Sequence, residues 1–473
     1  MKSLIRLSLL LITCSTLQAQ TTLNGTAWDG AIRIMGIELT IAVKFHTPAE
    51  TPAATIDIPQ QSAMGLPLTN ISQELPRVHF ELKAGPGLAV FEGTLQADSI
   101  TGIFTQASQM GTFYLRPHKE SKSEAKVEEP VPYKQDEVKF NNGGITLAGT
   151  LTLPPTSGKH PAVVMITGSG SQNRDEDIFG FKLFKIIADA LTRKGVAVLR
   201  SDDRGVGGSG GGTAESTTGD FAMDALSGVQ YLRSRKDIDP NHIGLCGHSE
   251  GALAASIAAD KSHDVAFIVL LAGPGVPGDT LILWQQVTLM RASGASDSDI
   301  NEAAALQHRV YDAVRTDSGW DQIRSSLSER IAHSLGKLTP DQRKALGDSA
   351  SFVASRTDAT LRDVRRPWFK YFIMYDPAPT LRRIKCPVLA LFGELDMQVP
   401  PAVAMKPLEA ALNEGGNTDV TVRVLPKANH LFQAAVTGLP SEYGSLKKEF
   451  VPGFLDTLST WVTKRVEMQP QGR

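Results

Sequence analysis

The sequence predicts an α/β protein in which a mostly parallel sheet is covered by helices, with a separate small antiparallel β domain before it. Three observations support this prediction. Residues 21–116 contain strands in which apolar and polar residues alternate. From residue 138, short apolar strands alternate with helices, as in a sheet buried on both faces. Residues 117–137 are rich in Lys, Glu, Ser and Pro and are typical of a linker.

The composition excludes several classes of protein. Of 473 residues, 41% are hydrophobic, which excludes wholesale disorder. The 48 Lys and Arg nearly balance the 50 Asp and Glu, so no overall field favours nucleic acid as a partner. Three Cys are too few for a disulfide scaffold and none are at metal-ligand spacing. We therefore expect no metal and no organic cofactor.

Residues 1–20 have the features of a secretory signal peptide. Two basic residues precede the apolar run Leu7–Ile12, and a small residue, Ala19, stands near the expected cleavage point. The run is far shorter than the ~20 residues of a spanning helix, and no later segment is long enough either. The expected mature protein is periplasmic or secreted, and lipid anchoring at Cys14 is the minor alternative.

The N-terminal β domain is expected at residues 21–116. Apolar residues alternate with polar ones from Ile37 to Phe45, and the pattern recurs three times before Leu115. Gly and Pro clusters separate these runs, as turns require. A sandwich or a barrel of roughly a hundred residues fits the pattern, and no catalytic constellation occurs in it.

The second domain is expected at residues 138–473. Its predicted strands are 145–153, 162–166, 196–199, 242–246, 265–271, 388–392 and 420–425, and its predicted helices are 181–194, 221–234, 251–259 and 447–465. Residues 275–380 carry only helical signals. Because the chain returns to the same sheet on both sides of this block, we interpret it as a helical lid rather than as a separate domain.

The strongest chemical signal is the sequence Gly-His-Ser-Glu-Gly at residues 247–251. It lies between the predicted strand 242–246 and the predicted helix 251–259. A Ser between glycines at such a junction sits on a tight turn that exposes its hydroxyl at the top of the sheet. Ser249 is therefore the expected nucleophile. The ring of His248, next to it in the chain, is expected to point away from Ser249.

A Ser nucleophile needs a base and a third group that orients the base, and for this turn the chain order is Ser, acid, His. Asp396 follows the strand 388–392 and is the expected acid, while its competitor Glu394 is expected to cap a turn. Among ten histidines, His430 is the one that follows the strand 420–425, and it is the expected general base.

Acyl transfer also needs hydrogen-bond donors for the developing oxyanion. One expected donor is the backbone N–H of Glu250, at the start of a helix. The second is expected from the loop after strand 162–166, at Ser169 or Gly170. The charges at 171–177 either shape the substrate side or lie in solvent. The Gly-rich stretch 202–209 lacks the Lys and Ser or Thr of a phosphate loop and is interpreted as a structural loop.

These residues together resemble the α/β-hydrolase superfamily over residues 138–465. Residues 167–175 and 368–377 look like stretches of bacterial secreted esterases related to the dienelactone-hydrolase and prolyl-oligopeptidase branches. Some of those esterases also carry a small N-terminal β domain. The resemblance implies a hydrolase of carboxylic esters with the triad Ser249, His430 and Asp396.

Two departures and three alternatives accompany this prediction. Thr167-Gly168 stands where those esterases have His-Gly, and Ala252 stands where they often have a further Gly. An acylaminoacyl-peptidase-like activity is the nearest rival, but the β region is too short for a screening propeller. Thioester cleavage would use the same triad. A non-catalytic binding protein is disfavoured, because all three triad residues are present. The oligomeric state is left open.

Overall fold

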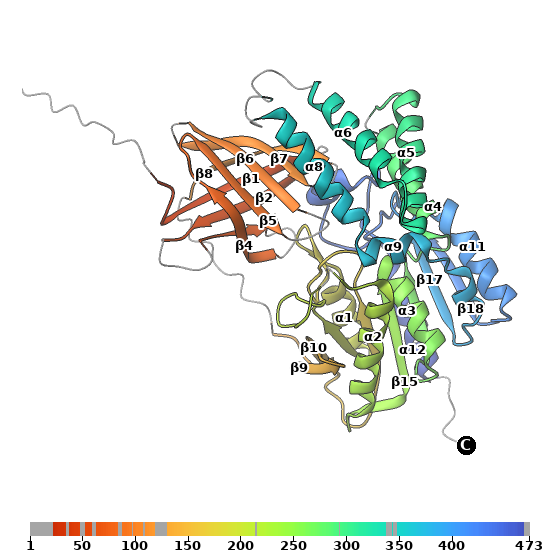
Figure 1. Ribbon diagram of the computed structural model, residues 1–473. Helices are drawn as coiled ribbons and strands as arrows, with labels where there is room; N and C mark the ends of the chain where they lie inside the picture. Colours follow the sequence, from red (N-terminus) through yellow and green to blue (C-terminus); the bar gives the residue numbers. More distant parts are fainter. Residues whose placement is uncertain are drawn as a thin grey trace, which may run out of the picture.

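The computed structural model describes residues 22–34, 37–47, 53–58, 63–83, 88–96, 98–106, 109–118, 130–212, 215–292, 294–336, 343 and 348–467. The expected signal peptide, Cys14 and most of the linker lie outside the described residues. Figure 1 shows an antiparallel barrel on one side and an α/β domain with helices above its sheet on the other. The prediction of an α/β fold with a separate N-terminal antiparallel domain is confirmed.

The N-terminal domain is a closed eight-stranded barrel. Its strands are β1 Thr26–Ile34, β2 Ile37–Phe45, β3 Ala54–Ile58, β4 Ala63–Ser72, β5 Arg77–Lys83, β6 Leu88–Gln96, β7 Ser99–Gln106 and β8 Gln109–Pro117. Neighbours in sequence pair antiparallel, and β8 returns to pair with β1, which closes the barrel. Alternate residues point inward, so the apolar set predicted from the period-two pattern fills the interior.

The α/β domain is built on an eight-stranded sheet in the order β18-β17-β16-β15-β11-β14-β10-β9. The strands are β9 Lys134–Asn142, β10 Ile145–Leu153, β11 His160–Ile166, β14 Ala197–Ser201, β15 Ile238–His248, β16 Phe267–Leu271, β17 Val388–Gly393 and β18 Val420–Leu425. From β14 to β18 neighbours pair parallel, whereas β9 and β10 form an antiparallel edge.

Helices cover both faces of this sheet. They are α1 Leu183–Arg193, α2 Thr218–Arg233, α3 Glu250–Lys261, α11 Pro401–Glu414 and α12 Phe454–Glu467. The closing helix therefore begins at Phe454 and not at residue 447, because the segment before it forms turns around the 3-10 helix η2 Pro440–Ser445. A short hairpin, β12 Asp177–Ile178 and β13 Phe181–Lys182, precedes α1.

Strand β9 starts inside the segment that the composition predicts to be linker. Its side chains are mostly exposed, with Val138 and Phe140 facing inward. A strand at a sheet edge can be polar over most of its length, so its composition resembles that of a linker.

The insertion between β16 and β17 is helical in its described residues. Its helices are α4 Gly278–Ala292, α5 Asp297–Thr316, α6 Trp320–Gly336, α8 Ser349–Val364, α9 Pro367–Met374 and α10 Ala378–Leu381. They share a small apolar core that includes Leu306, Val310, Tyr311 and Leu361. Figure 1 shows α5, α6 and α8 above the sheet, with α8 beside the barrel. Among the described helices, none combines the length and apolarity needed to cross a membrane.

Candidate active site

Ser249 lies on a strained turn between β15 and α3. Its φ of 54° and ψ of −117° are in a region that residues with a side chain rarely adopt. A Cβ on Gly247 would lie 2.0 Å from the Gly251 carbonyl oxygen, and one on Gly251 would lie 2.1 Å from that of Ile166. Both flanking glycines are therefore required by close backbone contacts. The Ser249 N–H donates to the Leu271 carbonyl at 2.8 Å, which ties the turn to the adjacent strand.

Asp396 and His430, from the ends of β17 and β18, meet in the interior. The His430 Nδ1 lies 2.8 Å from the Asp396 Oδ2, and both side chains are buried. The other carboxylate oxygen of Asp396 accepts the N–H groups of Gln398 and Val399, each at 2.8 Å. Because these bonds fix the carboxylate and occupy Nδ1, the ring nitrogen left to exchange a proton is Nε2.

His430 also lies against the residue that precedes Ser249. The rings of His248 and His430 have centroids 4.7 Å apart, and the His248 Nε2 is 3.0 Å from the His430 carbonyl oxygen. Three distant stretches of chain, ending at Ser249, Asp396 and His430, thus meet at the carboxyl end of one sheet. Glu394 takes no part in this cluster, since its carboxylate accepts the Lys427 N–H at 2.8 Å and closes a turn.

The loop after β11 supplies the candidate oxyanion donors. The Gly168 N–H is already used, because it donates to Glu176 at 2.8 Å. Within the described chain, the backbone N–H groups of Ser169 and Gly170 have no acceptor, and neither does that of Glu250 at the start of α3. These three N–H groups stay the candidate donors for an oxyanion.

Sequence reasoning missed a buried pair, Glu176 and His248, beneath this loop. Their exposed side-chain fractions are 1% and 2%, and the His248 Nδ1 is 2.7 Å from the Glu176 Oε1. Burial alone would lower the pKa of His248, but the charge and hydrogen bond of Glu176 outweigh it and the pKa is raised. The other ring nitrogen, Nε2, lies 3.0 Å from the His430 carbonyl oxygen, so both nitrogens of the ring have an acceptor nearby. No local signal in the sequence links these residues.

The Glu250 side chain joins the nucleophile turn to the lid. It is 2% exposed, and its Oε1 accepts the Thr218 hydroxyl at 2.6 Å and the Trp368 indole N–H at 2.7 Å. Burial raises the pKa of this carboxyl, and hydrogen bonds from Thr218, Trp368 and Ser169 oppose that rise. A second link runs from α4, where the Gln285 amide donates to the Gln398 carbonyl at 2.7 Å. The lid is thus attached to both the nucleophile turn and the acid turn.

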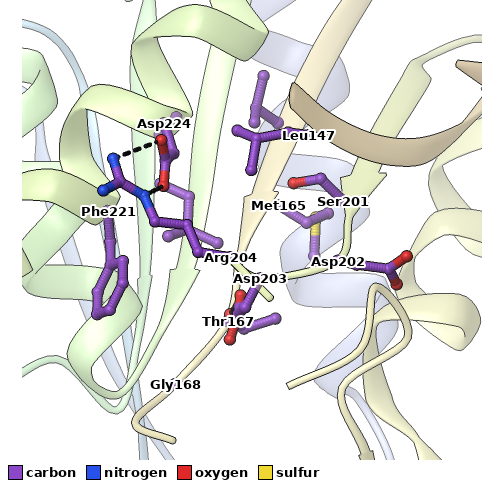
Figure 2. Close-up of a pocket in the computed structure, with 13 residues that line it drawn as sticks. Leu147, Met165, Thr167, Gly168, Ser201, Asp202, Asp203, Arg204, Phe221 and Asp224 are labelled. Carbon is purple, nitrogen blue, oxygen red and sulfur yellow. Dashed lines mark hydrogen bonds and ion pairs between the residues drawn. The ribbon is translucent and has the colours of Figure 1, made fainter. Parts of the chain in front are cut away.

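A small cavity of about 30 Å³ is lined in part by Thr167 and Gly168, which begin the loop after β11 (Figure 2). Asp203 lines it and accepts the Thr167 hydroxyl at 2.6 Å and the Gln172 N–H at 2.8 Å. Burial raises the pKa of Asp203 to about 8, with smaller contributions from the charges of Glu176 and Glu250. The cavity has room for only one or two waters, so it is not a site for an ester substrate.

Charged residues in the stretch 171–177 form ion pairs within the protein. The Arg174 guanidinium donates to both oxygens of Asp202 and also to Glu137. Asp175 forms an ion pair with Arg200. These pairs attach the loop to the adjoining strands, and the stretch beginning at Asp202 is a structural element of the same network. Among the described residues, no group of three or more His, Cys, Asp or Glu side chains is placed to hold a metal ion.

A strained Ser between a parallel strand and a helix, beside a buried Asp–His pair at the same sheet edge, is the arrangement of an α/β hydrolase. Residues 163–436 match the family model described as the alpha/beta hydrolase family, and the chain belongs to that family.

The chain is also similar to individual proteins. The chain is 28% identical over 349 residues to Esterase EstD of Thermotoga maritima, with 72% of each chain covered. It is 24% identical over 258 residues to an uncharacterized 31.7 kDa protein of Escherichia coli, covering 54% of this chain and 79% of that one. A solved structure, the Pyrococcus furiosus esterase Pf2001, aligns with 71% of this chain and 91% of its own length at 16% identity and a TM-score of 0.40.

Proposed function

We propose that this hydrolase is a serine carboxylesterase that cleaves small acyl esters through an acyl-enzyme intermediate. The observation that carries the proposal is the buried 2.8 Å contact between His430 and Asp396 at the sheet edge where Ser249 forms the strained turn. The similarity to an esterase over 72% of the chain adds support.

In this mechanism His430 takes the proton of the Ser249 hydroxyl as the oxygen attacks the ester carbonyl. Asp396 holds the ring in the required tautomer and stabilises the imidazolium that forms. The oxyanion accepts hydrogen bonds from the Glu250 N–H and from Ser169 or Gly170. His430 then protonates the leaving alcohol, and water releases the acid by the same steps in reverse.

The test combines hydrolysis and labelling. Wild type should hydrolyse p-nitrophenyl acetate or butyrate, and Ser249→Ala should abolish turnover while it leaves the fold intact. A fluorophosphonate should label only the peptide that contains Ser249, as mass spectrometry can determine. Equal rates for the two proteins, or labelling elsewhere, would contradict the assignment. Parallel assays on a thioester and on an acylaminoacyl peptide separate the alternative substrates of the same triad.

Export from the cytoplasm is part of the proposal and rests on residues 1–20 alone. N-terminal sequencing of protein recovered from the periplasm or medium should begin near residue 20. An intact Met1 in the mature protein would contradict export by this signal.

A further inference from the structure

We propose that the N-terminal barrel is a positioning domain for the active site, and that the side chain of Phe179 transmits its effect. The inference rests on the proposed function, because it assigns a role to the loop that supplies the oxyanion donors. The barrel meets the α/β domain at η2, which lies against β2, and at two apolar contacts. One is Phe179, which packs against the apolar interiors of both domains. The other is an apolar contact between the barrel and the lid.

Phe179 has a backbone conformation that its side chain disfavours. It forms the turn of the β12–β13 hairpin with Gly180, and both have positive φ, 54° and 80°. A two-residue turn with two positive φ values is type I′, for which Asn-Gly is the preferred sequence. A Phe at its first position costs local stability. The presence of a Phe at position 179 is therefore explained by the contacts of its ring and not by the requirements of the turn.

The hairpin leads directly to the oxyanion loop. Glu176 lies three residues before Phe179 and holds both the Gly168 N–H and the His248 ring. The connecting chain is rigid, because the Asp177 carboxylate accepts the Gly180 N–H at 2.9 Å and the Asn173 side-chain oxygen accepts the Asp175 N–H at 3.0 Å. Glu176 itself has a φ of 46°, so it is also held away from the favoured backbone regions.

Phe179 also reaches the acid turn. Its ring contacts that of Tyr443 edge-on, with centroids 6.4 Å apart. Tyr443 belongs to η2, which lies against strand β2 of the barrel. The buried Tyr443 hydroxyl accepts the Gln398 amide at 3.1 Å, and the Gln398 N–H donates to Asp396. The Phe179 side chain, which packs against the barrel, is thus linked through a few contacts to the oxyanion loop and to the catalytic acid.

The second contact with the barrel provides a matched control. Ile103 of the barrel and Leu335 of the lid are both buried together, with Met110, Phe352 and Val353 around them. These lid residues belong to α6 and α8, and none of their described hydrogen bonds reaches the oxyanion loop or Asp396. Weakening this contact loosens the attachment of the barrel without touching the hairpin.

The experiment compares three variants of the full chain. Phe179→Asn removes the ring but installs the preferred Asn-Gly turn, so the hairpin itself is retained. We expect kcat on p-nitrophenyl butyrate to fall by about 10-fold to 10²-fold with little change in KM, since small displacements of catalytic groups have effects of this size. The rate of fluorophosphonate labelling of Ser249 should fall in parallel. Phe179→Leu should restore most of the activity, and Phe352→Ala should change kcat by less than about twofold.

Three results would overturn the positioning role of Phe179, and a fourth would refute the proposed function. A folded Phe179→Asn protein with wild-type kcat overturns the positioning role, and so does a Phe352→Ala protein that loses as much kcat as Phe179→Asn. If Phe179→Asn fails to fold while Phe179→Leu folds with full activity, the ring is structural and the proposal is again overturned. A wild type that is neither active on esters nor labelled at Ser249 instead refutes the proposed function, on which this inference depends.

Discussion

The interior of the barrel and the carboxyl end of the α/β sheet bury side chains of opposite character. The barrel interior is apolar and aromatic, and Phe91 stacks on Phe80 at 4.5 Å with Phe104 and Phe113 edge-on at 5.1 and 5.2 Å. The sheet end buries carboxylates and imidazoles instead: Glu176, His248, Glu250, Asp396 and His430.

This difference indicates that the barrel interior contributes mainly to stability and the sheet end mainly to catalysis. Burying apolar rings is favourable in itself, whereas burying charge is costly unless each group is paired and hydrogen-bonded. At the sheet end, acidic side chains hold the loop after β11: Glu176 accepts the Gly168 N–H and Asp203 accepts the Thr167 hydroxyl. A change in the barrel should therefore alter the free energy of unfolding, and a change at the sheet end should alter turnover.

The largest effect is expected from Asp396→Asn. The new amide can keep its oxygen toward the N–H groups of Gln398 and Val399, so the turn is preserved. Its NH₂ group then faces the His430 Nδ1 and stabilises the tautomer with the proton on Nε2, which cannot act as a base toward Ser249. We expect kcat to fall by about 10⁴-fold with little loss of stability. A fall of less than tenfold in steady-state assays would remove Asp396 from the triad.

Phe91→Ala should have the opposite effect to Asp396→Asn: it should lower the stability and leave kcat almost unchanged. The ring is fully buried between strands, and its removal should lower the free energy of unfolding by about 3–5 kcal/mol. Hydrogen exchange should localise the loss to the barrel strands. At temperatures well below the unfolding transition, kcat should stay near the wild-type value because Phe179 still packs against the barrel. A large loss of kcat without a loss of stability would contradict the comparison.

The half-buried carboxyl of Asp203 predicts a dependence of stability on pH. Its folded-state pKa is raised to about 8 from an ordinary value of 3.8, so its contribution is fully present below the unfolded value and is lost as the pH rises through the folded one. Between about pH 5 and about pH 9, the unfolding free energy of wild type should fall more steeply than that of Asp203→Asn. Parallel slopes in denaturant titrations would show that the pKa of Asp203 is not raised in the folded state.

Much of the fold was predictable because its signals are local. The apolar runs of the parallel strands and the period-two pattern of β2 can be identified from neighbouring residues alone. Barrel closure was not predictable, because it depends on β8 pairing with β1 some eighty residues away, and a sandwich fits the same strands. The polar edge strand β9 was hidden for a related reason, since only its pairing with β10 makes it a strand.

The candidate site, too, has a part that local signals predict and a part that depends on contacts between distant residues. Ser249, Asp396 and His430 follow strand ends, so topology alone brings them to one edge, and their roles stay predictions until activity is measured. The Glu176–His248 pair joins residues 72 positions apart that carry no motif. His248 precedes Ser249 in the sequence, but only packing shows that its ring lies against that of His430. Sequence patterns thus do not predict pairs of buried charged residues that are far apart in the chain.

The smallest effect is expected from Glu394→Gln, which is the control for Asp396→Asn. Both acids follow β17 and are two residues apart, so the sequence left them as competitors. The Glu394 carboxylate accepts only the Lys427 N–H among its described hydrogen bonds, at an exposed turn, and a Gln oxygen can replace it there. We expect kcat within about twofold of wild type. If instead Glu394→Gln loses activity on the scale of Asp396→Asn, the 2.8 Å contact of His430 with Asp396 is not the one used in turnover.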